Sequence, residues 1–251
     1  MKLAACALIA ACTASGGTLA HSPIPDDATQ LVTAIVDDWS STNATLQLFQ
    51  RARGSGWQPV GDPWPGVIGA KGAAWGDGLH GRGAPSAQHG PLKHEGDQTS
   101  PAGAFAIRGA YGYAATPPTG TILAYTPSRD PLRCVDDPSS AHYAQIVDRD
   151  KVATPDWKTA ELIKRPDALY TWIVDVAHNP QRIRGDGSCI FLHVWDGPSS
   201  TTVGCTAMAE PRLAQLVAVL QPTAVFVLLP RAAYESLAGA WGLPKSSKLP
   251  P

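Results

Sequence analysis

Residues 187–205 read Gly-Ser-Cys-Ile-Phe-Leu-His-Val-Trp-Asp-Gly-Pro-Ser-Ser-Thr-Thr-Val-Gly-Cys. Residues 189–195 are nearly all apolar, which predicts a buried β-strand with His193 towards its end. The small polar loop that follows is able to fold Cys205 back towards this histidine. Because a thiol reacts as its thiolate and a nearby imidazole takes its proton, the pair is predicted to form half of a catalytic site.

Gly204, just before Cys205, is predicted to assist this nucleophile. A glycine there permits backbone conformations that side chains disfavour. We expect the amide N–H groups of Gly204 and Cys205 to form an oxyanion hole for an incoming carbonyl. The group that orients the His193 imidazole is left open between Ser188, Ser200 and a backbone carbonyl. A buried structural cysteine and a hydrogen-bonded core histidine are the alternative interpretation of the pair, because their spacing alone is not diagnostic.

A second block, residues 93–107, reads Lys-His-Glu-Gly-Asp-Gln-Thr-Ser-Pro-Ala-Gly-Ala-Phe-Ala-Ile. Turn residues lead here into a predicted strand that alternates on Phe105 and Ile107. Together with the block around Cys205, it resembles the catalytic domain of the L,D-transpeptidases, the YkuD-like family. The resemblance runs from about Thr33 to Leu229, with the motifs in the family's order. Further matches are Cys134-Val135-Asp136-Asp137-Pro138, Glu161, Asp167-Ala168-Leu169-Tyr170 and His178-Asn179.

The resemblance implies a mainly β fold of the sandwich or barrel-like kind, with a few short helices, one of which follows the nucleophile. It implies an acyl transfer in cell wall biogenesis. Cys205 attacks a peptidoglycan stem tetrapeptide, D-alanine leaves, and an acceptor amine takes the acyl group, with His193 as proton donor and acceptor. Two alternatives stay open: an L,D-carboxypeptidase or amidase that hydrolyses the same acyl-enzyme, and an inactive wall-binding module.

One departure from the family concerns the residues around the nucleophile. Better-known members carry Ser-His-Gly-Cys and an arginine two residues after the cysteine. Here Thr202-Val203-Gly204-Cys205 is followed by Thr206-Ala207, which resembles a branch with Val-Gly-Cys in place of His-Gly-Cys. The residue that binds the donor carboxylate is therefore left unassigned.

The N-terminus has the features of a secretory signal peptide. Met1-Lys2, the apolar run of residues 3–12 and Thr18-Leu19-Ala20 give a charged start, a short hydrophobic core and small residues at the end. We therefore expect residues 1–20 to be a signal peptide and the protein to be exported to the periplasm or cell envelope. Alternatively, residues 9–12 resemble a lipoprotein box, and membrane attachment is expected only if Cys12 is lipidated.

Composition excludes several partners and cofactors. Cleavage after Ala20 removes Lys2 and no acid, which leaves 19 basic against 21 acidic residues and no electrostatic case for nucleic acid. No glycine-rich phosphate loop follows a predicted strand, so no nucleotide is expected. Neither a metal nor any other cofactor is expected, because no familiar zinc-ligand spacing occurs among His80, His89, His94 and Glu95.

Export would leave three cysteines, which cannot all pair with one another. The economical arrangement is a Cys134–Cys189 disulfide with Cys205 free, in an oxidising compartment. If Cys205 paired with either partner instead, the enzyme would be inactive until it was reduced. Cys189 is expected to be a poor nucleophile because its apolar surroundings disfavour the thiolate.

The chain is predicted to form one catalytic domain over residues 31–230, preceded by a lead-in at 21–30 and followed by a C-terminal helix or disordered tail at 231–251. High glycine and proline content, 24 and 23 residues, also favours a mainly β fold. Predicted elements are paired strands at 31–37 and 45–51, a partly helical segment at 159–178, a helix from Pro211 through Leu213, Leu216, Val217 and Leu220, and a strand at 224–229.

Two loop-rich regions and the carboxylate of Glu161 give further expectations about the site. Trp57, Trp64 and Trp75 lie in a loop-rich region and are expected to pack beneath loops, with a glycan groove as the alternative. Residues 116–155 form a long excursion that is predicted to cover the site as a lid. Glu161 matches a family position, but we expect a solvated or structural carboxylate.

Overall fold

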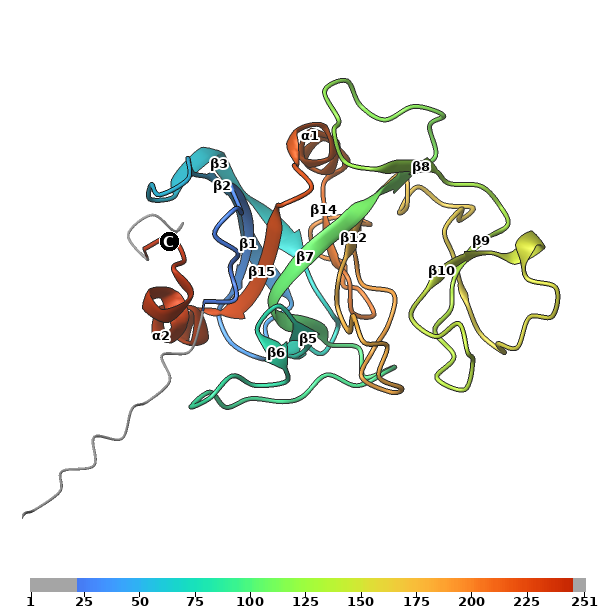
Figure 1. Cartoon of the computed structure of the whole chain (residues 1–251), viewed down its shortest axis with the longest axis horizontal. Helices are drawn as coiled ribbons and strands as arrows, with labels where there is room; N and C mark the ends of the chain where they lie inside the picture. The colour runs from blue at the N-terminus through green and yellow to red at the C-terminus, as the bar shows by residue number, and fades with distance from the viewer. Residues whose placement is uncertain (1–21, 246–251) are drawn as a thin grey trace, which may run out of the picture.

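A computed structural model describes residues 22–245, so the predicted signal peptide and Cys12 lie outside the described residues, as do residues 246–251. The described chain is mainly β and is built on a closed mixed barrel of eight strands (Figure 1), which confirms the mainly β, barrel-like prediction. In ring order the strands are β12 (Trp172–Val176), β13 (Phe191–Val194), β14 (Thr206–Met208), β3 (Gln58–Val67), β2 (Asn43–Gln50), β1 (Gln30–Val36), β15 (Val225–Pro230) and β7 (Ser100–Gly112), which pairs with β12 and closes the ring.

The strand register positions the candidate site residues. β1 and β2 pair antiparallel, with Leu31 opposite Phe49, as predicted for two consecutive strands. β15 pairs parallel with β1 and antiparallel with β7, so the last strand lies between segments distant in sequence. β13 and β14 pair parallel, with His193 opposite Ala207. The residue before β14, Cys205, therefore lies next to the start of β13.

Two α-helices occur in the described residues, α1 (Glu210–Val219) and α2 (Arg231–Trp241). Helix α1 confirms the predicted helix after the nucleophile, and its apolar face, with Leu213, Leu216 and Val217, is buried. It contacts β12 and β13, whereas α2 packs against β15 and β1. Neither helix is long and apolar enough to span a membrane.

The end of α2 offers a paired test of backbone conformation. Gly242 caps the helix at φ 63°, in the left-handed region that disfavours a side chain, whereas Gly239 lies inside the same helix with open space around it. Gly242→Ala is expected to lower the free energy of unfolding by about 1 kcal/mol. Gly239→Ala is expected to raise it by about 0.5–1 kcal/mol. Urea unfolding measures both, and equal effects of the two changes would refute the explanation.

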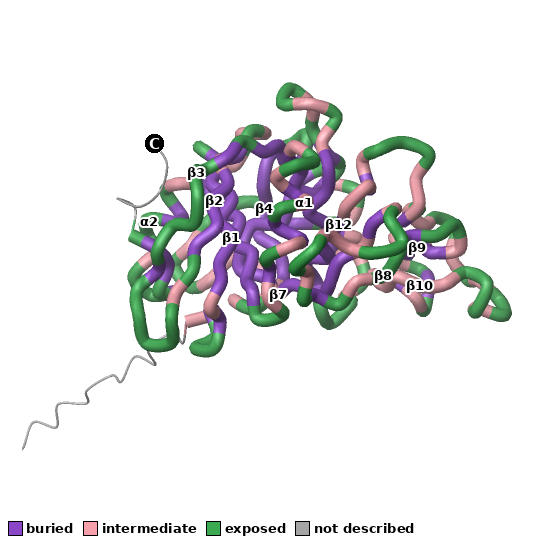
Figure 2. Tube along the Cα trace, turned by 90° about the horizontal axis from the view of Figure 1, so that it is seen from above, coloured by how far each residue is buried: buried purple, intermediate pink, exposed green. Residues whose placement is uncertain are grey.

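The main core fills the barrel and the space beneath the helices, as the buried centre of Figure 2 shows. Trp57, Trp64 and Trp75 belong to it and are 5%, 6% and 1% exposed, so they pack in the core, although Trp64 and Trp75 lie in strands rather than in the predicted loops. A second, smaller core, here called the outer cluster, lies beside it. It consists of Leu132, Cys134, Ile163, Tyr170, Ile173, Phe191 and Cys205.

A three-stranded sheet made by β10 (Ile146–Asp148), β9 (Leu132–Cys134) and β11 (Glu161–Leu162) lies beside the barrel (Figure 1). The partly helical prediction for residues 159–178 is wrong, because β11 and β12 occupy this segment. Pro166 cannot continue a helical hydrogen-bond ladder, and the Trp-Ile-Val-Asp-Val run of β12 pairs instead with β7 and β13. The other short elements are β4 (Ala73–Trp75), β5 (Asp77–Gly78), β6 (Gly81–Arg82), β8 (Tyr125–Pro127) and the 3₁₀ turn η1 (Arg149–Lys151).

The Cys134–Cys189 disulfide joins this small sheet to the segment that enters β13, with a Cα–Cα distance of 5.9 Å. The predicted pairing is confirmed, and within the described residues Cys205 is the free cysteine. The C-terminal helix is likewise confirmed by α2. After it, Leu243 is 6% exposed and the Tyr234 hydroxyl donates to the carbonyl of Pro244, so the ordered chain continues past the predicted start of the tail.

Candidate active site

Cys205 lies directly before β14, in the outer cluster and beside a cavity of about 240 Å³. The residue is 4% exposed. Its Sγ accepts a hydrogen bond from the Phe191 amide at 3.3 Å, and its thiol donates to the Cys189 carbonyl at 3.5 Å. The free thiol is thus held at the pocket wall by the backbone of the adjoining strand.

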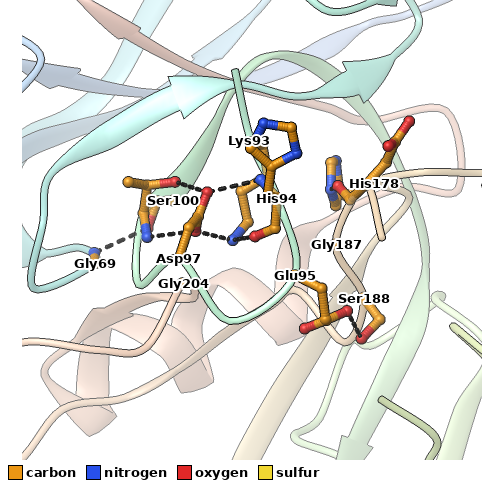
Figure 3. A network of polar contacts seen from close by, with 12 residues as sticks. Gly69, Lys93, His94, Glu95, Asp97, Ser100, His178, Gly187, Ser188 and Gly204 are labelled. Carbon is orange, nitrogen blue, oxygen red and sulfur yellow. Dashed lines mark hydrogen bonds and ion pairs between the residues drawn. The ribbon is translucent and has the colours of Figure 1, made fainter. Parts of the chain in front are cut away.

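Two hydroxyl groups anchor the backbone of Cys205. Its carbonyl accepts from Ser100 Oγ at 2.8 Å and from Thr202 Oγ1 at 2.7 Å. Ser100 also accepts from the amide of Gly69 at 2.9 Å, a contact drawn in Figure 3. Sequence reasoning assigned Ser100 and Thr202 no role, although both belong to the blocks that carry the family resemblance.

Gly204 adopts φ 149°, where a side chain would be strained, and a Cβ there would lie 3.2 Å from the carbonyl oxygen of Thr99. This agrees with the expected need for glycine. Its amide N–H, however, donates to Thr202 Oγ1 at 3.1 Å. The expectation that this N–H is open to an incoming carbonyl is therefore not met in this conformation, because a nearby hydroxyl already accepts it.

His193 is buried in β13, and its Nδ1 lies 2.7 Å from the carbonyl oxygen of Val194. Because a carbonyl only accepts, the tautomer that donates from Nδ1 to Val194 keeps a lone pair on Nε2, and the carbonyl of Leu169, whose hydrogen bond also raises the pKa of His193, competes for the ring proton. Of the groups considered for orienting the imidazole, a backbone carbonyl contacts the ring, while the hydroxyls of Ser188 and Ser200 donate to Glu95 and Gly197. Burial lowers the pKa of His193 to about 4, against the opposing effect of the Val194 bond.

The structure places His193 and Cys205 on adjacent strands but does not join them directly. Phe191 and His193 lie on the same face of β13, because they are two residues apart. The ring of Tyr170 packs against both, with centroid distances of 5.8 Å and 5.2 Å. Among the described residues, no hydrogen bond joins His193 to Cys205. Tyr170 also belongs to the outer cluster together with Cys205, so it is a shared neighbour of the predicted pair.

Residues from distant parts of the chain line the pocket beside Cys205, among them Lys93, Glu95, Asp136, Glu161 and Gly204. Three of these are carboxylates. The Glu95 carboxylate accepts from the hydroxyls of Tyr143 at 2.6 Å and Ser188 at 2.7 Å. One carboxylate oxygen of Asp136, Oδ1, is buried and has no hydrogen-bond partner among the described residues. The pocket wall is therefore acidic.

Lys93 is the basic residue of this lining, and its ammonium group is already engaged. Its side chain is 3% exposed, forms an ion pair with Asp97, and donates to the His94 carbonyl at 2.9 Å. Burial alone would raise the pKa of Asp97, but hydrogen bonds from Lys93 and from the His94 and Thr99 amides lower it overall. Figure 3 shows this pair beside the Glu95–Ser188 contact. The pair explains why residues 93–99 form a tight turn that presents Glu95 to the pocket.

Glu161 was expected to be a solvated or structural carboxylate, and its contacts support the structural alternative. Its side chain is 21% exposed and lies in the pocket wall. The Tyr170 hydroxyl donates to its Oε1, and Arg165 Nη1 lies 3.9 Å from the same oxygen. Burial raises the pKa of Glu161 to about 7, although Tyr170 and Arg165 act to lower it. This carboxyl group therefore titrates near neutral pH.

Residues 116–155, which were predicted to cover the site as a lid, contribute to one wall of the pocket. They supply Asp136 to the pocket and Tyr143, whose hydroxyl also accepts from the Gly187 amide at 3.1 Å. The disulfide at Cys134 tethers this wall to Cys189. The excursion is thus bonded to the segment that leads into β13.

His80, His89 and His94, which were considered as zinc ligands, do not line the pocket beside Cys205. His80 Nε2 lies 3.1 Å from the Gly76 carbonyl, and its ring packs on Phe105 and Trp75. His89 and His94 are exposed. Across residues 22–245, no three His, Cys, Asp or Glu residues are grouped so as to hold a metal ion.

The protonation state of Cys205 leads to a test by alkylation. Burial, followed by the charge of Glu161, raises the pKa of its thiol well above the usual range. The thiolate fraction at neutral pH is therefore small, and we expect iodoacetamide to label folded protein at least about 100-fold more slowly than free cysteine. Mass spectrometry of the labelled protein measures the rate, which should keep rising with pH. A plateau near neutral pH would contradict this, and denatured protein provides the control.

No family model, curated protein or solved structure matches this chain. The family resemblance therefore rests on the sequence motifs.

Proposed function

We propose that this protein is a peptidoglycan L,D-transpeptidase that transfers an acyl group through a thioester on Cys205. In this proposal the barrel is the catalytic fold of that family, and the protein works in cell wall biogenesis after export to the periplasm or cell envelope. The donor is a stem tetrapeptide, and the bond that breaks joins its third residue to the terminal D-alanine.

The observation that carries the proposal is the convergence of residues from three motif blocks on the pocket beside Cys205, a pocket that His193 does not line. Glu95, Asp136 and Glu161 come from separate blocks of the resemblance, and all three line the cavity beside the free thiol of Cys205. Ser100, from the same block as Glu95, donates a hydrogen bond to the carbonyl of this cysteine. A purely structural cysteine would not require these residues to meet around an open cavity.

In the proposed reaction, Cys205 Sγ attacks the carbonyl carbon while His193 Nε2 accepts the thiol proton. The Val194 carbonyl holds Nδ1 and so keeps the required tautomer. His193 then protonates the departing D-alanine amine, and an acceptor amine attacks the thioester. The amide of Cys205 is the proposed oxyanion donor, since Gly204 is hydrogen-bonded to Thr202. The approach of His193 to Sγ requires a side-chain shift when the substrate binds.

Burial of the thiol is the observation that favours the alternative of an inactive wall-binding module. The decisive experiment is intact-mass analysis of the wild type and Cys205→Ala, each incubated with a disaccharide-tetrapeptide, with chromatography of the products. A thioester adduct on the wild type alone, with D-alanine release and dimer formation, supports the transpeptidase. Release without dimers supports the carboxypeptidase or amidase, and no adduct on folded protein with Cys205 reduced supports the binding module.

A further inference from the structure

We propose that Glu161 is the general base for the second half-reaction, in which a cationic primary amine attacks the thioester. This inference rests on the proposed acyl transfer. Glu161 belongs to β11 and Cys205 precedes β14, yet both line the same cavity. One carboxylate oxygen, Oε1, accepts from the Tyr170 hydroxyl. The other, Oε2, makes no hydrogen bond to a described residue and is available to an incoming N–H group.

The groups that face Glu161 favour a cationic ligand. Tyr170 and Arg165 contact its Oε1, and Asp136 and Glu95 lie across the pocket and raise its pKa. Lys93 is ion-paired with Asp97, and Arg165 lies closer to Asp167, at 2.8 Å, than to Glu161, at 3.9 Å, so these two cations are shared with carboxylates that do not line the pocket. The buried Oδ1 of Asp136 lacks a donor among the described residues. An ammonium group in this pocket would reduce the repulsion among the three carboxylates that line it.

An acceptor amine reaches the thioester as an ammonium ion, whose nitrogen has no lone pair for the attack. Glu161 takes a proton from the ammonium group, and the freed nitrogen lone pair attacks the thioester carbonyl carbon. The C–N bond forms and the C–S bond breaks. A second nitrogen-bound proton passes to the departing Cys205 thiolate, so an amide and a thiol result, and Glu161 releases its proton to solvent. No further reactant is needed.

The acidity of Glu161 suits this step. Burial holds its pKa at about 7, so at neutral pH a large fraction is the carboxylate, which is able to accept a proton. As the pH falls below 7 the carboxyl becomes protonated and aminolysis should slow. The same burial allows a substantial fraction of Glu161 to be protonated at neutral pH, whereas a carboxyl group in water is almost fully ionised at this pH.

The test follows breakdown of the acyl-enzyme with two acceptors. The protein is acylated with the disaccharide-tetrapeptide, and aminolysis is then timed by mass spectrometry with either the amine of a second tetrapeptide or hydroxylamine. Hydroxylamine is a weak base that is uncharged at neutral pH and needs no prior deprotonation. The variants are Glu161→Gln and, as a matched control, Glu235→Gln on the exposed face of α2.

Glu161→Gln is expected to slow aminolysis by the peptide amine at least about 100-fold, to abolish the loss of rate below pH 7, and to change the hydroxylamine rate only a few-fold. Glu235→Gln should behave as the wild type. Equal losses with both acceptors, or an unchanged pH profile in Glu161→Gln, would overturn the role of Glu161 while leaving acyl transfer intact. A wild type that forms no acyl-enzyme would overturn the proposed function itself. Melting curves and acylation rates separate these outcomes from misfolding.

Discussion

Replacing His193 with alanine is expected to slow acylation of Cys205 by about 10²- to 10⁴-fold, the range for loss of a general acid–base residue. The thiol of Cys205 is protonated at neutral pH because burial raises its pKa, so attack depends on a group that removes the proton. The neutral imidazole of His193 supplies a lone pair on Nε2. Single-turnover mass spectrometry of the adduct measures the acylation rate.

Two further variants make this result interpretable. His193→Gln retains an N–H donor for the Val194 carbonyl but lacks a base, so it should be as slow as the alanine variant while remaining better folded. His89→Ala changes an exposed histidine and should leave the rate unchanged. Wild-type acylation by His193→Gln would instead identify His193 as a hydrogen-bonded core histidine.

Removing the Cys134–Cys189 disulfide is expected to lower the free energy of unfolding by about 4 kcal/mol, the loop-closure value for a bond that spans 55 residues. The double variant Cys134→Ala/Cys189→Ala removes the bond without adding free thiols. Acylation should fall as well, because the disulfide tethers the wall that contributes Asp136 to Cys189, whose carbonyl accepts a hydrogen bond from the Cys205 thiol.

Urea unfolding of this double variant, beside the wild type and Cys205→Ala, measures the stability change. Cys205→Ala controls for the loss of a buried sulfur without loss of a cross-link. A difference below about 1 kcal/mol between the double variant and the wild type would show that the reduced chain keeps the wall in place by packing alone.

Local patterns predicted the regular elements near both ends of the domain. The alternation in residues 31–37 and 45–51 specified paired strands because one-sided burial selects a period of two. The apolar spacing of Leu213, Leu216 and Val217 after Pro211 specified α1. The same reasoning failed in residues 159–178, where strand pairing to β7 and β13 outweighed a weak helical pattern.

The sequence by itself determined the mainly β class and that one of the three cysteines outside the predicted signal peptide stays unpaired, because these depend on residue type, periodicity and cysteine number, while the structure decided that the free one is Cys205. Tertiary structure decided what surrounds the thiol. Asp136, Glu161 and Tyr170 are far from Cys205 in the chain, and closure of the barrel and the disulfide bring them near it. Thr202 engages the Gly204 amide, and burial sets the acidity of Glu161, His193 and Cys205. Such properties depend on distance and solvent exclusion, which residue order alone does not specify.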